Sequence, residues 1–181
     1  MDTEQDGHWH FQPEPFEGES FSHFLGRYCA LNCITPSGLA QHTLAGSVAI
    51  GRWRKLRYIP PPSEEQLQRL AEITGVSRER LSALLPQQPM QIGTIRLCAA
   101  CYAEQPYHRT HWQYKSTDYC ERHGLALLAR CPCCKASFPI PAEWETGMCL
   151  RCGKAFADLA KLQKQVVVPQ HRSRGASTKS P

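Results

Sequence analysis

Four pairs of metal-ligand residues, each pair separated by two residues, lie between positions 98 and 152 and constrain the fold more than any other feature. They form two groups, the first with three cysteines and one histidine and the second with four cysteines: Cys98, Cys101, Cys120 and His123, then Cys131, Cys134, Cys149 and Cys152. Two intervening residues let a tight turn aim both side chains at one ion, and two such turns complete the tetrahedron that zinc accepts. The sequence therefore predicts two Zn²⁺ sites in tandem.

Two other readings of these cysteines are weaker. A disulfide framework requires an oxidising compartment, but the polar, acidic N-terminus lacks the features of a secretory signal, and Cys133 is a spare thiol. We therefore expect a reducing, cytoplasmic location. Catalytic zinc is disfavoured because each group already supplies four protein ligands and leaves no position for water or substrate. We predict structural zinc, and no catalytic residue.

The fold class predicted from these patterns is a mainly α N-terminal helix-turn-helix domain followed by a small α+β zinc-ribbon or zinc-knuckle domain. A segment of about 55 residues buries too little surface to fold alone, so metal should hold the C-terminal part together. The expected boundaries are an extended arm (1–19), a helical domain (20–86), a linker (87–95), a tandem zinc domain (96–165) and a basic, disordered tail (166–181). We refer to residues 102–119, between the ligand pairs of the first group, as the first zinc loop, and to residues 135–148, between those of the second group, as the second zinc loop. Trp144 is predicted to form the small core of the second zinc loop.

Capping signals predict where the helices begin. Ser20 precedes apolar residues at helical spacing, and Thr35 followed by Pro36 opens a shorter helix that we expect to reach about Ala45. A capping box begins at Ser63, and Gly75 is placed to end that helix. The stretch from position 70 to 81 has the pattern of a helix-turn-helix, although helix pairs of this shape also serve as scaffolds.

Candidate binding residues outside the zinc groups are basic or aromatic. The chain has a net charge of +5, and its basic residues are clustered. Nucleic acid or an acidic protein fits such clusters, and a solvated basic face is the alternative. Our candidates for nucleic-acid contact are Arg52, Arg54, Lys55, Arg57, Arg109 and Lys115. Trp9 and Phe11, on the arm, are candidate protein anchors that could equally pack on the chain's own core.

Three stretches of the sequence resemble the TniQ/TnsD family of transposition target-selection proteins. The first runs from Pro13 to Ser20 and continues to Arg27. The second contains Arg96, Cys98 and Cys101, then Arg109 and Trp112, and the third leads from Cys120 through His123 to Cys131 and Cys134. The compact length resembles the small TniQ of type V-K CRISPR-associated transposons. The eight zinc ligands named above match the family's zinc positions.

This resemblance implies an adaptor without catalytic activity. Such a protein would link an RNA-guided CRISPR effector ribonucleoprotein at the target DNA to TnsC, the AAA+ ATPase that recruits transposase. The alternative reading is a sequence-specific DNA-binding transcriptional regulator that uses the helix-turn-helix and zinc units directly. For an adaptor of this kind we expect no small-molecule substrate. We expect no membrane partner either, because no apolar run approaches the length of about 18 residues needed to span a bilayer.

Overall fold

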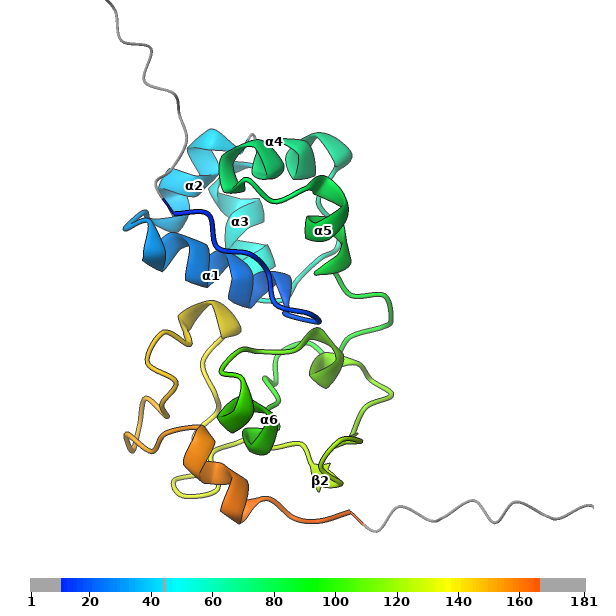
Figure 1. The fold of residues 1–181 in the computed structure, drawn as a ribbon, viewed down its shortest axis with the longest axis vertical. Coiled ribbons are helices and arrows are strands. Elements are labelled where there is room, and N and C mark those ends of the chain that lie inside the picture. The colour runs from blue at the N-terminus through cyan, green and yellow to red at the C-terminus, as the bar shows by residue number, and fades with distance from the viewer. Residues whose placement is uncertain (1–10, 44, 167–181) are drawn as a thin grey trace, which may run out of the picture.

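A computed structural model describes residues 11–43 and 45–166 of the chain. Five helices gather at one end of an elongated molecule, and a loop-rich unit with the sixth helix forms the other end (Figure 1). In the helical unit these are α1 (Phe21–Leu31), α2 (Pro36–His42), α3 (Gly46–Arg54), α4 (Glu64–Thr74) and α5 (Arg78–Ala83). Mostly helical structure with a small sheet is what the sequence predicted. Trp9 lies outside the described residues, as does most of the expected tail.

The helices begin where the capping signals placed them. Ser20, Thr35 and Ser63 each accept a backbone hydrogen bond at the first turn of α1, α2 and α4, and Ser63 forms the full capping box with Gln66. Gly75 ends α4 with a φ of 71°, a left-handed conformation that favours glycine. Helix α2 ends at His42, three residues before the expected limit at about Ala45. Local side-chain chemistry therefore accounts for the helix starts better than for their ends.

The second unit is built from short elements: α6 (Ala99–Glu104), the 3₁₀ helices η1 (Thr110–Gln113), η2 (Pro141–Glu143) and η3 (Ala157–Leu162), and the strands β1 (Tyr119–Cys120) and β2 (Leu125–Ala126). The two strands pair antiparallel with Cys120 opposite Leu125. Isolated bridges add the pairs Leu97 with Leu128 and Met148 with Ala155. Because these elements are so short, regular secondary structure alone cannot hold this unit together.

Aromatic side chains form much of the core in both units. In the helical unit, Phe21, Phe24 and Tyr28 of α1 are fully buried, and Trp53 of α3 lies beside Phe21 with ring centroids 5.9 Å apart. In the second unit, Trp144 packs on Phe156 at 4.9 Å and on Tyr102 at 5.6 Å. Among the described residues, none of the helices is both long and apolar enough to cross a membrane.

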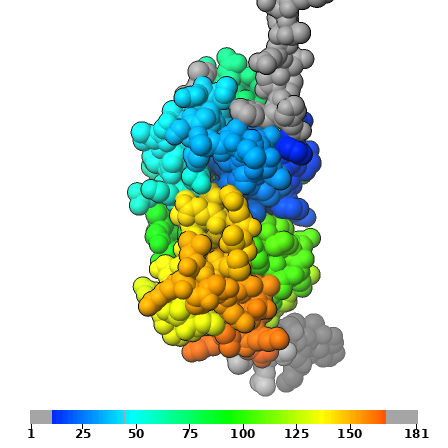
Figure 2. Space-filling view, turned by 90° about the vertical axis from the view of Figure 1, so that its left-hand side faces the viewer, coloured from blue at the N-terminus to red at the C-terminus, as the bar shows by residue number. Residues whose placement is uncertain are grey.

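Trp144 also joins the two units. Its ring lies 5.1 Å from that of His108 and 6.4 Å from that of His23 on α1. It therefore packs where α1, the first zinc loop and the second zinc loop meet, as well as in the core of the second loop. In Figure 2 the residues around η2 lie directly against the helical unit. Gly26 permits this approach, since an added Cβ would sit 2.3 Å from the Ala142 carbonyl oxygen.

A buried carboxylate reinforces the same joint. Glu19, which precedes α1, has no exposed surface, and its carboxylate contacts the side chains of His23 and Arg27. Its backbone forms a bridge with Arg109 of the second unit, and the Ser20 amide donates a hydrogen bond of 2.9 Å to the His108 carbonyl. The start of α1 and the first zinc loop are thereby fixed to each other.

Candidate metal centres and the surfaces around them

The first group of predicted ligands converges on one point. Cys98 precedes α6 and Cys101 lies on it, while Cys120 ends β1 and His123 lies in the turn before β2. The ligand atoms of all four residues lie within 4.8 Å of one another. The Cys101 and Cys120 sulfurs are 3.4 Å apart, and His123 Nδ1 lies 3.3 to 3.7 Å from the three sulfurs. Helix α6 and strand β1, at the two ends of the first zinc loop, thus bring the four side chains together.

The second group converges in the same way. Cys131, Cys134, Cys149 and Cys152 also place their sulfurs within 4.8 Å of one another. Cys131 and Cys152 are 3.7 Å apart, and Cys134 and Cys149 are 3.5 Å apart. Cys133, the spare thiol, is exposed and is outside both groups. The two centres differ in exposure: Cys152 is exposed, whereas all three cysteines of the first centre are buried.

These distances fit zinc. With Zn–S bonds of about 2.3 Å and Zn–N bonds of about 2.0 Å, a tetrahedral site has S···S edges of about 3.8 Å and S···N edges of about 3.5 Å. The separations in both centres lie close to these edges. Oxidised pairs would instead have sulfurs about 2.05 Å apart. Both groups are therefore suited to a tetrahedral metal ion, and such an ion would supply structural cross-linking.

Neighbouring groups orient the ligands. His123 turns its second ring nitrogen, Nε2, to the Glu104 carboxylate at 3.1 Å, which leaves Nδ1 for a metal. The side chain of Gln163 accepts a hydrogen bond from the Ala99 amide and donates one to the Ala126 carbonyl, each 2.8 Å long. In the second centre, burial raises the pKa of Cys149, but the amides of Cys152 and Arg151, together with hydrogen bonds to the Cys134 and Cys152 thiols, outweigh burial and lower that pKa to about 7. The thiolate form that binds metal is thereby favoured.

Glu104 and Gln163 were not among the residues that the sequence singled out. Neither lies at a ligand spacing, and each meets its partner only through the fold. Arg96, which the sequence named only as part of the family resemblance, has a structural role: its buried guanidinium donates to the carbonyls of Tyr114 and Thr117 and so fixes the long loop between the first two ligand pairs.

The candidate nucleic-acid residues fall in two places. Arg52, Arg54, Lys55 and Arg57 follow one another at the end of α3, where Lys55 and Arg57 are exposed. Arg52 and Arg54 are half-buried and reach the carbonyls of Pro60 and Ala142. Arg109 and Lys115 belong to the first zinc loop, and Lys115 is exposed.

Arg109 has a mainly internal environment. Only 8% of its surface is exposed, and its guanidinium lies over the rings of Tyr107 and Trp112, at 4.3 and 5.3 Å from their centroids. One of its nitrogens donates to Gln105. Burial in this stack argues against direct contact with nucleic acid. Trp112, another residue of the stretch that resembles the TniQ/TnsD family, is fully buried beside Arg109.

Phe11, one of the two predicted protein anchors, is 59% exposed. Its backbone amide and carbonyl pair with the side chain of Asn32 at the end of α1. The side chain of Phe11 is thereby presented outward while its backbone is held in place. Its role as an anchor stays a prediction.

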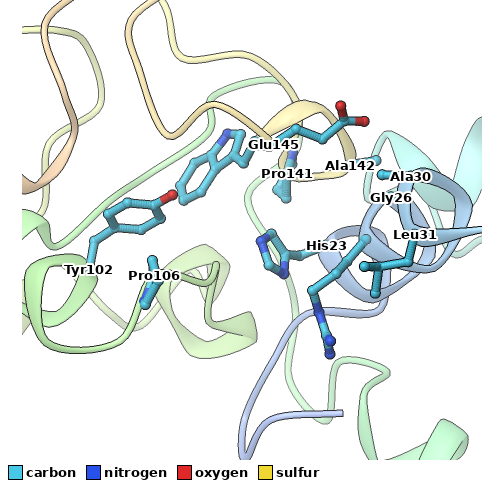
Figure 3. A pocket seen from close by; sticks show the side chains of 11 residues that line it. His23, Gly26, Ala30, Leu31, Tyr102, Pro106, Pro141, Ala142 and Glu145 are labelled. Carbon is cyan, nitrogen blue, oxygen red and sulfur yellow. The ribbon is translucent and has the colours of Figure 1, made fainter. Parts of the chain in front are cut away.

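A pocket of about 400 Å³ opens at the joint between the units. In Figure 3 His23 of α1 faces Tyr102 and Pro106 across it, and Pro141, Ala142 and Glu145 line its edge. Arg27 also lines the pocket. Arg27 and His23 are both engaged by the Glu19 carboxylate. Their side chains therefore serve the joint, and the pocket is a by-product of how the two units meet.

A comparison with protein families identifies relatives of the chain. A family model for TniQ matches residues 10–127, which include α1 to α6 and the whole first metal centre. The chain belongs to the TniQ family. A comparison with curated proteins finds no match. TniQ proteins are adaptors associated with transposition, so the chain is expected to work with other transposition components.

The TniQ resemblance noted in the sequence has a structural basis. The stretch from Pro13 to Arg27 supplies the Glu19 carboxylate and its partners, and the later stretch supplies Arg109 and Trp112. Phe16 stacks on Tyr107 at 4.8 Å, and the Arg27 guanidinium lies over the Phe16 ring, 4.5 Å from its centroid. Most of these motif residues thus hold the helical unit against the first metal centre.

Proposed function

We propose that the protein is a non-enzymatic adaptor that links an RNA-guided CRISPR effector at the target DNA to the AAA+ ATPase TnsC, in a bacterial cytoplasm. Membership in the TniQ family is the observation that carries this proposal. The compact, two-unit architecture supports it, and the resemblance to the small TniQ of type V-K systems supplies the identity of the two partners.

We further propose that both metal centres hold structural Zn²⁺. Cys98, Cys101, Cys120 and His123 would bind one ion, and the four cysteines from Cys131 to Cys152 would bind the other. Each ion would be worth on the order of 10 kcal/mol to the folding of its unit near neutral pH. The zinc would supply rigidity, since each centre already offers four ligands.

The buried joint explains how such a protein could act as an adaptor. Glu19, Trp144 and the close contact at Gly26 hold the helical unit and the metal-bearing unit in one relative orientation. Surfaces for two partners are then presented in a fixed relation, so less ordering entropy is lost when both bind. Two modest contacts on one rigid body also reinforce each other through effective concentration.

The alternative, a sequence-specific DNA-binding regulator, has less support. Helix α5 would be the recognition helix, but it has six residues, and its basic side chains face acids: Arg78 is 3.1 Å from Glu64, and Arg80 is 3.8 Å from Glu14. Phosphate contact would have to compete with these exposed pairs. Whether the α4–α5 pair reads DNA stays a prediction.

A pull-down with the TnsC ATPase tests the adaptor function. The zinc-loaded protein should be retained by the ATPase in the presence of ATP and duplex DNA, and the retention should not depend on the DNA sequence. The same protein alone should bind duplex DNA weakly and with strong salt dependence, because phosphate contact releases counterions without reading bases. Tight binding to one DNA sequence, with no retention by the ATPase, would favour the regulator.

A further inference from the structure

One face of α3 carries only exposed or half-buried residues in the part of the chain that the structure describes. Ile50 and Trp53 of this helix are buried in the core of the helical unit. Val48, Gly51, Arg52 and Lys55 fall on the opposite side, because residues three and four apart share a helix face. Val48 has 79% of its surface exposed.

The chain that follows α3 extends this face. The Arg57 amide donates to the Arg52 carbonyl at 2.9 Å, and the Arg52 guanidinium donates to the Pro60 carbonyl at 3.4 Å. The intervening Ile59 is 84% exposed. We refer to this surface as the α3 patch, which consists of Val48, Gly51, Arg52, Lys55, Arg57 and Ile59.

The patch combines exposed aliphatic side chains with positive charge. Val48 and Ile59 are the two most exposed large aliphatic residues among those described. From Ser20 to Ser63 the sequence contains no aspartate or glutamate, so the basic residues of the patch have no acidic neighbour along the chain. Apolar side chains grouped on a surface with uncompensated charge are characteristic of a protein-binding site.

Gly51 provides an independent indication of a partner. A glycine inside a helix costs roughly 0.5–1 kcal/mol relative to alanine. Packing within the described chain does not account for it, because an added Cβ at this position would meet no atom within 4 Å. The space beside Gly51 is open, so the backbone of another chain could approach the helix closely at this point.

We infer that the α3 patch docks the protein partner of the proposed function, the ATPase, through a segment that carries carboxylates and aliphatic side chains. This assignment differs from the nucleic-acid role that the sequence alone favours for Arg52, Lys55 and Arg57. Phosphate groups would satisfy those cations but would leave Val48 and Ile59 in water, whereas an acidic and apolar protein segment satisfies both. The identity of the partner rests on the proposed function.

The test compares binding of full-length, zinc-loaded variants to the ATPase, with ATP and duplex DNA present, and to single-stranded RNA. The double variant Val48→Ser/Ile59→Ser and the single variant Gly51→Leu should each bind the ATPase at least tenfold more weakly than the unchanged protein. Their RNA binding should change less than twofold, because all three basic residues of the patch are retained. Gly51→Leu should fold at least as stably, since leucine is a better helix former than glycine.

The matched control is Leu150→Ser, which removes an aliphatic side chain that is 73% exposed on the second zinc unit. It should bind the ATPase like the unchanged protein. If both patch variants bind normally, or if they lose RNA binding to the same extent, the docking assignment is wrong while the adaptor function stands. If the unchanged protein itself fails to bind the ATPase, the proposed function is wrong and the docking assignment falls with it.

Discussion

Replacing Glu19 with glutamine should destabilise the protein more than any other single change of a carboxylate to an amide. The Glu19 side chain is fully buried and receives four hydrogen bonds. One oxygen accepts from the Phe16 amide and from Arg27 Nη2, each at 2.9 Å, and the other meets Arg27 Nε at 3.2 Å and the His23 ring. Glutamine has the same shape but only one acceptor oxygen.

The magnitude follows from this count. The amide group of glutamine would face two of the four groups without accepting their hydrogen bonds, and each buried donor left unsatisfied costs about 1–3 kcal/mol. The Arg27 charge would also lose its partner, and breaking a buried ion pair costs about 3–5 kcal/mol. The two costs describe the same lost contacts, so they are not added, and the Arg27 side chain is 22% exposed and keeps part of its hydration. We therefore expect Glu19→Gln to lower the free energy of unfolding by about 3 kcal/mol.

Urea unfolding of the zinc-loaded protein, followed by tryptophan fluorescence, measures this loss directly. Trp144 and Trp112 lie at or near the joint, so their emission should report its opening. Glu72→Gln is the matched control, because Glu72 forms an exposed pair with Arg69 at 3.0 Å and such pairs contribute less than about 1 kcal/mol. Equal midpoints for the two variants would refute the view that the Glu19 carboxylate holds the units together.

Three further predictions concern the joint and the metal centres. Burial alone would raise the pKa of the Glu19 carboxyl, but its bonds with His23 and Arg27 outweigh burial and lower that pKa in the folded protein. The carboxylate should therefore stabilise the fold fully above about pH 4.3, the value for a free glutamate, and lose this effect as the pH falls through the lower folded pKa. The difference in stability between the unchanged protein and Glu19→Gln, measured from pH 7 downward, should shrink in that acidic range, and a difference independent of pH would contradict this prediction. Gly26→Val should lower the unfolding midpoint by forcing η2 away from α1, because even a Cβ would lie 2.3 Å from the Ala142 oxygen. Gly38→Ala, in the first turn of α2, should change the midpoint little, because an added Cβ there would come no closer than 3.4 Å to another group, the Thr35 hydroxyl. Equal midpoints for the two variants would show that the contact at Gly26 is not needed. Cys120→Ser should reduce the zinc content from two ions to one by native mass spectrometry and unfold the first centre, and a folded variant that still carries two ions would rule out the ligand assignment.

The metal centres illustrate what could be predicted from sequence. Ligand pairs separated by two residues form local turns, so the spacing itself identified the eight side chains that the fold brings within 4.8 Å in two groups. The starts of α1, α2 and α4 were predictable for the same reason, because a capping side chain bonds to a backbone amide only three residues away. The end of α2 was less predictable, because it is marked by no glycine.

Arg109 and Trp144 illustrate the opposite case. The sequence around Arg109 mixes basic and aromatic residues and favoured nucleic-acid contact, but the fold stacks its guanidinium between Tyr107 and Trp112 and buries it. Trp144 was assigned to one loop, yet it also contacts α1 from a distance of 121 positions along the chain. Residue type alone does not distinguish a cation that meets solvent from one that packs on rings.

The sequence by itself thus determined the two groups of candidate metal ligands, the helix starts and the family, since each depends on residues close together in the chain or on a fixed order of motifs. Only the tertiary structure decided that Glu19 and Trp144 form a joint between two units, and that Val48 and Ile59 lie exposed beside uncompensated basic residues. The physical reason is that burial and charge pairing depend on residues distant in sequence, whose positions are set by the packing of the whole chain.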